Sequence, residues 1–196
     1  MKRKILFVLI LLCGIFVYAG PFGLSMGMTY DEVQEACGGR VPQRIENDDR
    51  YYIVPEKSHS MFKIYIAWIS DEYGLYYIKA ISDEVYTSDY GTEAVDRFYP
   101  FKERLANIYG EPEVFDGMID KNSFLRDDKY WMSALRDGAR QLYARWTLDD
   151  KKVHFKDNLI FVYFGVNYFD SEHTYFILEY AFENQFKVDQ QEDDVL

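Results

Sequence analysis

Three histidines are the first residues to consider for catalysis or metal binding. His59, His154 and His173 stand far apart in the sequence, and none occurs in an HxxH, HExxH or HxH arrangement. Those spacings are how short segments bring several zinc ligands together, so a zinc site has no support. His59 falls in a polar stretch and the other two flank predicted strands. We interpret all three as surface or strand-edge histidines.

Nucleophilic and nucleotide-dependent chemistry has equally little support. The chain contains no Gly-x-Ser-x-Gly elbow, no P-loop and no Gly-rich dinucleotide fingerprint. Cys37 would need an exposed thiol to act as a nucleophile with a distant histidine. Its helical spacing from Tyr30 and Val33 places it instead on an apolar helix face, where a free cysteine is a small buried residue. We therefore predict no cofactor and no metal.

Carboxylates are the third source of chemistry, because paired acids serve glycoside hydrolysis or calcium binding. They occur in clusters: Glu46-Asp48-Asp49, Asp83-Glu84, Asp127-Asp128, Asp149-Asp150 and Glu192-Asp193-Asp194. None has EF-hand spacing, and adjacent charges in loops usually form solvated faces. A carboxylate hydrolase stays as an alternative, and it requires two acidic side chains about 5 to 9.5 Å apart in one pocket.

Aromatic residues are the largest excess, with 18 Tyr, 15 Phe and 3 Trp among 196 residues. If the apolar side of each predicted strand faces inward, the opposite side combines tyrosines with cations: Lys63, Tyr65, Tyr77, Lys79, Tyr143, Arg145, Tyr163 and Tyr175. Tyr and Arg are enriched where proteins bind each other, so we predict that these residues form a binding surface. Tyrosine is also a good strand former that tolerates half-exposure, and a helix over this face would remove the surface.

A β-hairpin must position the first of these residues. Residues 62–69 and 75–82 alternate between the two side-chain types, and a turn at 71–74 joins them, which predicts antiparallel pairing. A short strand at 51–54 precedes the hairpin. In its first strand the residues expected to face inward are Phe62, Ile64, Ile66 and Trp68.

A second group of strands carries the remaining surface residues. It comprises residues 142–148, 159–168 and 173–182, with a turn at 170–172. In the first of these strands the residues expected to face inward are Leu142, Ala144, Trp146 and Leu148.

Helices precede each group of strands. Thr29 is an N-cap whose capping box is completed by Glu32, and Gly38-Gly39 ends that helix. A second helical region runs from near Thr92 to Gly110, and Pro100 either opens a helix at its first turn or kinks a longer one. A shorter helix is predicted over residues 129–136.

The order of helix, three strands, helices and three strands predicts an α+β fold with helices packed on antiparallel sheet. A tandem repeat would divide the domain 20–188 into halves 20–88 and 89–188. The pattern leaves open whether the strands form one continuous sheet or two. Residues 189–196 are acidic and are expected to form a flexible tail.

The first nineteen residues have the parts of a secretory signal. Lys2, Arg3 and Lys4 precede an apolar run over 5–17, and cleavage after Ala19 would leave Gly20 as the first residue. The run is shorter than the roughly 20 residues of a spanning helix, so we expect no transmembrane anchor after cleavage. Export to the periplasm or the medium is the prediction; an uncleaved anchor or lipidation at Cys13 are the alternatives.

Charge and cysteine content limit the partners of the exported chain. Loss of the signal removes three basic residues and no acidic one, so the formal net charge moves from −11 to −14. Such a chain is poorly suited to bind nucleic acid or an anionic membrane. Only Cys37 remains, which excludes an intramolecular disulfide.

Two segments resemble known exported proteins. Residues 22–33, with Gly27-Met28-Thr29 and then Val33, resemble the G-M-T-x-x-E/Q-V helix start of small exported bacterial proteins. These include the small lipoprotein family of the outer-membrane β-barrel assembly machinery and the β-lactamase-inhibitor-like fold. The helix ending Phe101-x3-Leu105-x3-Tyr109-Gly110-x-Pro112 is similar to one in many exported bacterial proteins.

The resemblance implies a helix-plus-antiparallel-sheet module that binds other proteins and performs no catalysis. The inhibitor-like fold repeats such a module twice and grips its partner with an aromatic-rich sheet face. The matched residues are structural positions and not a site. We therefore expect an exported bacterial interaction module that binds another envelope protein, with a carboxylate-dependent envelope hydrolase or a purely structural envelope protein as alternatives.

Overall fold

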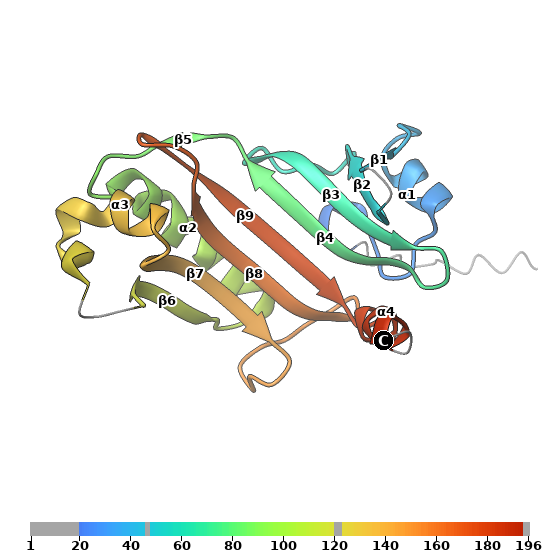
Figure 1. The fold of residues 1–196 in the computed structure, drawn as a ribbon. Helices are drawn as coiled ribbons and strands as arrows, with labels where there is room; N and C mark the ends of the chain where they lie inside the picture. Colours follow the sequence, from blue (N-terminus) through green and yellow to red (C-terminus); the bar gives the residue numbers. More distant parts are fainter. Residues whose placement is uncertain (1–19, 46–47, 120–122, 194–196) are drawn as a thin grey trace, which may run out of the picture.

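The strands form one continuous antiparallel sheet in the computed structural model, which describes residues 20–45, 48–119 and 123–193 (Figure 1). Its order is β1-β2-β3-β4-β9-β8-β7-β6, with β5 paired beside β9. The strands are β1 Gln43–Arg44, β2 Arg50–Ile53, β3 Phe62–Ser70, β4 Gly74–Ser82, β5 Val85–Tyr86, β6 Glu113–Met118, β7 Arg140–Thr147, β8 Leu159–Tyr168 and β9 His173–Phe182.

Four α-helices accompany the sheet in the described part of the chain, and they confirm the predicted α+β class. They are α1 Tyr30–Ala36, α2 Thr92–Tyr109, α3 Trp131–Arg136 and α4 Gln185–Asp193. Strands β4 and β9 pair at the centre, which joins the two halves of the chain into a single sheet.

The start of α1 confirms the predicted capping box. The Thr29 hydroxyl accepts the Glu32 N–H at 3.3 Å, and the Thr29 N–H donates to the Glu32 carboxylate at 2.8 Å. These two bonds satisfy backbone donors that the first helical turn leaves free. Val33 and Cys37 are both wholly buried, as their shared helix face predicts.

Helix α2 is a single helix that continues through Pro100, so the longer of the two predicted helices is the one formed. Pro100 lies on the exposed side, where water can bond the carbonyl that loses its intrahelical partner. The opposite side packs on the sheet through Phe98 and Phe101, whose rings lie 5.3 and 4.7 Å from that of Phe164 on β8.

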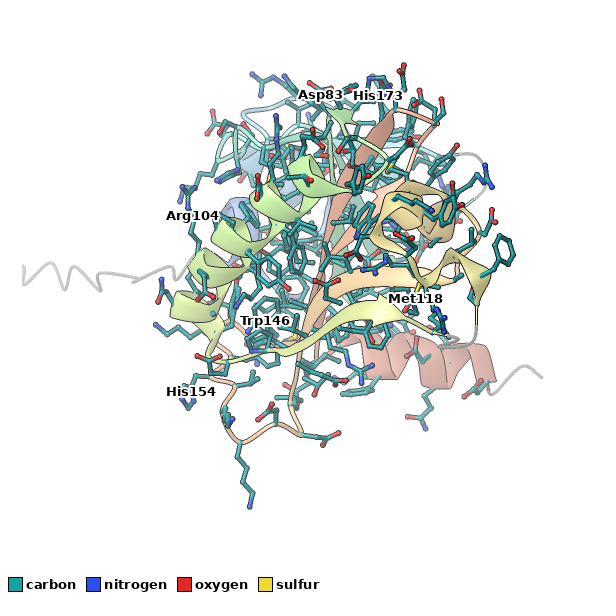
Figure 2. All side chains as sticks on the ribbon, turned by 90° about the vertical axis from the view of Figure 1, so that its left-hand side faces the viewer. Asp83, Arg104, Met118, Trp146, His154 and His173 are labelled. Atoms are coloured by element: carbon teal, nitrogen blue, oxygen red, sulfur yellow. The ribbon has the colours of Figure 1, made fainter. Side chains whose placement is uncertain are left out.

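Most of the core lies on the face of the sheet that α1 and α2 cover. Leu142, Ala144 and Trp146 of β7 are buried as predicted, and the Trp146 indole N–H donates to the Gly110 carbonyl at 2.7 Å beneath α2 (Figure 2). Leu148 is 58% exposed, which corrects its expected inward position. The reason is that β7 ends at Thr147, so the alternation no longer applies beyond it.

Strand β3 requires a second correction, because a β-bulge reverses its alternation. Phe62 pairs with Ser82 and Ile64 with Ile81, which leaves Lys63 as an extra residue. After the bulge the odd-numbered residues face the core. Tyr65 is therefore 4% exposed and Ile64 44% exposed, the reverse of the prediction.

The C-terminal segment also differs from the prediction. Residues 189–193, expected in a flexible tail, form the end of α4. The Asn184 amide fixes the start of this helix by donating to the Tyr73 and Leu75 carbonyls at 2.8 and 2.9 Å. Residues 194–196 and the predicted signal at 1–19 lie outside the described residues.

Candidate functional site: the open face of the sheet

One face of the sheet carries most of the predicted surface residues. We call it the open face: it lies opposite α1 and α2, and of the helices that the structure describes only α4 lies over one end of it (Figure 1). Its larger side chains include Tyr52, Ile66, Trp68, Tyr77, Lys79, Phe115, Tyr143, Arg145, Phe161, Tyr163, Tyr175 and Glu179. Most are half-exposed, as expected of a sheet face that meets solvent.

Two of the predicted surface residues do not lie on the open face as expected. Tyr65 is in the core, where its hydroxyl donates to the His59 carbonyl at 3.1 Å and accepts the His59 N–H at 2.8 Å. Lys63 lies at the bulge on the rim and pairs with Asp83 at 3.5 Å. The other predicted residues, Tyr77, Lys79, Tyr143, Arg145, Tyr163 and Tyr175, share the open face.

A row of paired residues crosses the open face from edge to centre. The register places Arg145 opposite both Glu113 and Tyr163, and Glu179 opposite both Tyr163 and Lys79. Arg145 pairs with Glu113 at 2.7 Å, and Lys79 with Glu179 at 2.9 Å. The charges therefore alternate in sign and neutralise each other along the row.

Aromatic rings stack across the same strands. The Phe115 and Tyr143 rings are stacked at 5.6 Å, and those of Tyr143 and Tyr163 lie 5.5 Å apart. Gly165 makes room for this arrangement: a Cβ at that position would lie 2.4 Å from the Tyr163 hydroxyl. The absence of a side chain at Gly165 lets the Tyr163 ring lie along the sheet. We call Phe115, Tyr143, Phe161 and Tyr163 the aromatic ladder.

The phenols near the centre of the open face are strongly held in the protonated form. Burial, and then the Glu179 carboxylate, raises the pKa of Tyr163 to about 12. The same two causes raise the pKa of Tyr77 further. Both side chains therefore offer a neutral hydroxyl beside a flat ring, which suits contact with another protein surface.

A cleft of about 470 Å³ lies where α4 meets the open face, and we call it the α4 cleft. A second bulge builds its floor: Trp68 pairs with Tyr77 while Ile69 pairs with Leu75, so Tyr76 is the extra residue and lines the cleft beside Tyr77. The other lining residues are Asp48, Asp49, Lys79, Glu179, Gln185, Val188 and Asp189.

Sequence reasoning missed the α4 cleft. Trp68 was expected in the core, and Asp48 and Asp49 in a solvated loop. The Tyr76 hydroxyl donates to the Asp49 carboxylate, so this pair draws the loop onto the sheet. Burial and the neighbouring Asp48 raise the pKa of Asp49. The adjacent aromatic pair Tyr76-Tyr77, which breaks the alternation of β4, is the one local signal of the bulge.

The histidines and the cysteine do not gather at this site. His154 and His173 lie at opposite ends of the molecule (Figure 2), and His59 packs 5.3 Å from the Phe101 ring. Burial raises the pKa of the Cys37 thiol, which disfavours the reactive thiolate. In the described residues, no three His, Cys, Asp or Glu side chains are placed to hold a metal ion.

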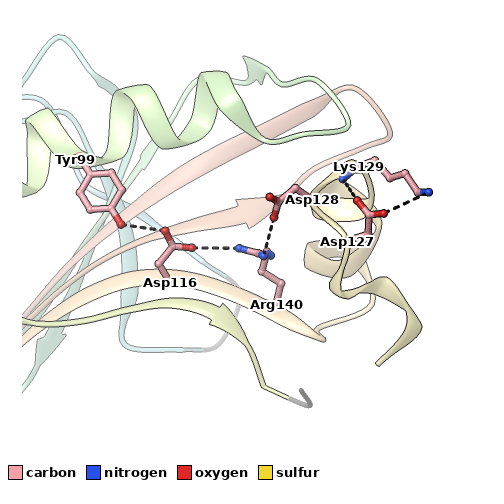
Figure 3. Close-up of polar contacts among 6 residues, drawn as sticks. All are labelled: Tyr99, Asp116, Asp127, Asp128, Lys129 and Arg140. Atoms are coloured by element: carbon pink, nitrogen blue, oxygen red, sulfur yellow. Dashed lines mark hydrogen bonds and ion pairs between the residues drawn. The ribbon is translucent and has the colours of Figure 1, made fainter. Parts of the chain in front are cut away.

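A second polar cluster lies near α2 and has a structural explanation (Figure 3). Asp116 of β6 accepts the Tyr99 hydroxyl at 2.9 Å and a guanidinium N–H of Arg140 at 3.2 Å. Arg140 also lies 3.7 Å from Asp128. The cluster thus connects α2, the edge strand β6, β7 and the turn before α3, and it braces these elements.

Comparisons with known proteins add no assignment: no known family, curated protein or solved structure matches the chain. No helix among the described residues is long and apolar enough to cross a membrane.

Proposed function

We propose that this chain is an exported bacterial protein that binds another protein through the open face and catalyses no reaction. The observation that carries the proposal is the gathering of Tyr, Trp, Arg and Lys on one sheet face that α1 and α2 leave uncovered. Three of these residue types, Tyr, Trp and Arg, contribute most of the binding energy in protein interfaces. Because the aromatic ladder is already stacked, little side-chain entropy remains to be lost on binding.

The partner that this surface fits has a basic rim. The chain from residue 20 carries a formal net charge of −14, whereas the charges within the open face neutralise each other. An acidic protein attracts a basic partner over long range and discriminates against an acidic one.

We also propose that the two halves of the chain are a tandem repeat. In each half a helix comes first, and four strands then run in chain order from an edge of the sheet to its centre, β1–β4 in one half and β6–β9 in the other. Strand β5 has no counterpart among the described strands of the second half. The antiparallel pairing of β4 with β9 places the last strand of each series side by side at the centre of the sheet.

The open-face variant combines Tyr143→Ser with Tyr175→Ser, and its matched control combines Tyr90→Ser with Tyr130→Ser. The control removes two tyrosines that are 60% and 39% exposed and lie in segments outside the sheet. The chain 20–196, immobilised and exposed to envelope extract, should lose at least tenfold in capture of its partner with the open-face variant alone. Both variants should unfold at nearly the same temperature as the unsubstituted chain. Equal capture by the two variants would contradict the proposal.

A carboxylate hydrolase is the second candidate, because the α4 cleft brings Asp49 and Glu179 to one site beside the Trp68 ring. The raised pKa of Asp49 suits a general acid. However, Glu179 is paired with Lys79. The test is whether the chain releases reducing ends from envelope polysaccharide. Activity that is lost in both Asp49→Asn and Glu179→Gln would favour a hydrolase over a binding protein.

A further inference from the structure

The α4 cleft has a corner of aromatic rings as its floor. The Trp68 and Tyr77 rings meet edge to face at 4.9 Å and 74°, and Tyr76 lines the cleft from the adjoining bulge position. Tyr77 also belongs to the open face, so the cleft continues that surface toward α4. A flat group that enters the cleft can therefore stack on one ring and contact the edge of another.

The carboxylates of the cleft are not all neutralised. Asp48 pairs with Arg50 at 2.5 Å and Glu179 with Lys79 at 2.9 Å. Asp49 accepts the Tyr76 hydroxyl, and burial with the neighbouring Asp48 raises its pKa. Asp189 also lines the cleft, and within the described ranges it takes part in no ion pair. One carboxylate thus remains for a cation, and it repels an anionic ligand.

Helix α4 forms the remaining wall. Val188 is 7% exposed and lines the cleft with Gln185 from the preceding turn. The bonds from the Asn184 amide to the β3–β4 turn hold this wall in place. The site is therefore a formed cleft with an apolar side, an aromatic floor and carboxylates at its edge.

We propose that the α4 cleft receives an arginine side chain of the protein that binds the open face. This inference rests on the proposed function, and it names the part of the partner that enters the cleft. A guanidinium group is planar, stacks on Trp and Tyr rings, and donates in parallel to a carboxylate. A lysine ammonium matches the charge but offers no flat face to the rings.

Acetyl-arginine-amide is the probe, and acetyl-citrulline-amide, which has the same shape without the charge, is its control. Trp68 reports binding by fluorescence, because Trp131 and Trp146 are only 3% and 0% exposed. We expect saturable quenching with the arginine probe, at least tenfold weaker affinity for the citrulline probe, and no quenching in Trp68→Phe. Quenching that persists in Trp68→Phe, or equal affinity for the two probes, would overturn the proposal.

Carboxylate variants assign the charge contacts. Asp189→Asn should weaken the arginine probe at least fivefold, whereas Asp83→Asn, on the rim beside Lys63, should leave its affinity unchanged. Acetyl-ornithine-amide should bind more weakly than the arginine probe. Equal binding of these two probes would show a general cation site and would overturn the choice of arginine.

Partner capture separates this inference from the proposed function. Both the cleft proposal and the proposed function are supported if partner capture is abolished by Tyr143→Ser with Tyr175→Ser and is reduced by Asp189→Asn. Capture that depends on the tyrosines while the arginine probe fails to bind overturns the cleft proposal alone. The arginine probe could also bind while neither the tyrosine variant nor Asp189→Asn reduces partner capture. That result would overturn both the role of a partner's arginine and the proposed function.

Discussion

Tyr65 is predicted on the binding surface, but the structure buries it in the core. Its ring lies 4.9 Å from that of Phe22, and its hydroxyl closes a short loop by bonding both the N–H and the carbonyl of His59. Tyr143 is also a strand tyrosine, but it is half-exposed on the open face, where its ring lies 5.6 Å from that of Phe115 and 5.5 Å from that of Tyr163. The two tyrosines therefore separate stability from binding.

We expect Tyr65→Ser to lower the free energy of unfolding by about 3–5 kcal/mol, because it removes a buried ring and leaves a cavity. Tyr65→Phe should cost about 1–2 kcal/mol through the two hydrogen bonds alone. Tyr143→Ser should cost less than about 1 kcal/mol. Urea unfolding of the chain 20–196 measures all three, and a Tyr65→Ser cost no larger than that of Tyr143→Ser would place Tyr65 outside the core.

At the scale of elements, the two bulges and one glycine decide what the strands present. Each bulge places two consecutive side chains of one strand against one of its neighbour, at Lys63 in β3 and at Tyr76 in β4. Gly165 in β8 has a different effect, because it gives the Tyr163 ring a place to lie without changing the register.

Gly165→Ala should displace Tyr163, since the new Cβ would lie 2.4 Å from its hydroxyl. The freed ring meets more water, so its pKa should fall from about 12 toward the ordinary tyrosine range. Absorbance of tyrosinate during an alkaline titration measures this change. Gly117→Ala on β6 is the matched control, because a Cβ there meets nothing within 4 Å; an identical titration of both variants would contradict the assigned packing.

At the scale of the whole molecule, the pairing of β4 with β9 makes the open face continuous. Tyr77, Lys79 and Trp68 come from the first half of the chain, and Glu179 and Tyr163 from the second. No segment of the chain carries the complete surface. The site exists only when the two halves have joined at the centre of the sheet.

Stability of the whole fold should fall on mild acidification partly through His59. Burial, and then Arg104, lowers the pKa of His59 in the folded chain. As the pH drops through about 6.5, His59 binds a proton in the unfolded chain but not yet in the folded chain. The folded state therefore loses stability from that pH down to the pKa of His59 in the folded chain.

His59→Asn removes this titration and keeps an acceptor for the Met61 N–H, which the ring nitrogen accepts at 3.1 Å. The urea midpoint should therefore decrease less in His59→Asn than in the unsubstituted chain between about pH 7.5 and about pH 5. The same decrease in both proteins would mean that His59 titrates as an exposed histidine.

The sequence by itself determined the local elements of this protein. The capping box at Thr29, the glycines after α1 and α2, and the alternation of β7 act within a few residues, so their effects are independent of distant contacts. These features suffice for the α+β class, for the positions of α1, α2 and α3 and of the longer strands, and for a tyrosine-rich face on strands β4, β7, β8 and β9.

Only the tertiary structure decided the rest. The edge strand β6 and the helix α4 have weak local patterns and are held by partners distant in the chain, such as the Tyr73 carbonyl that binds Asn184. The bulges depend on register between strands, which no single strand encodes. The face of Tyr65 and the existence of the α4 cleft both follow from those registers, because one extra residue moves every later side chain of a strand to the opposite face.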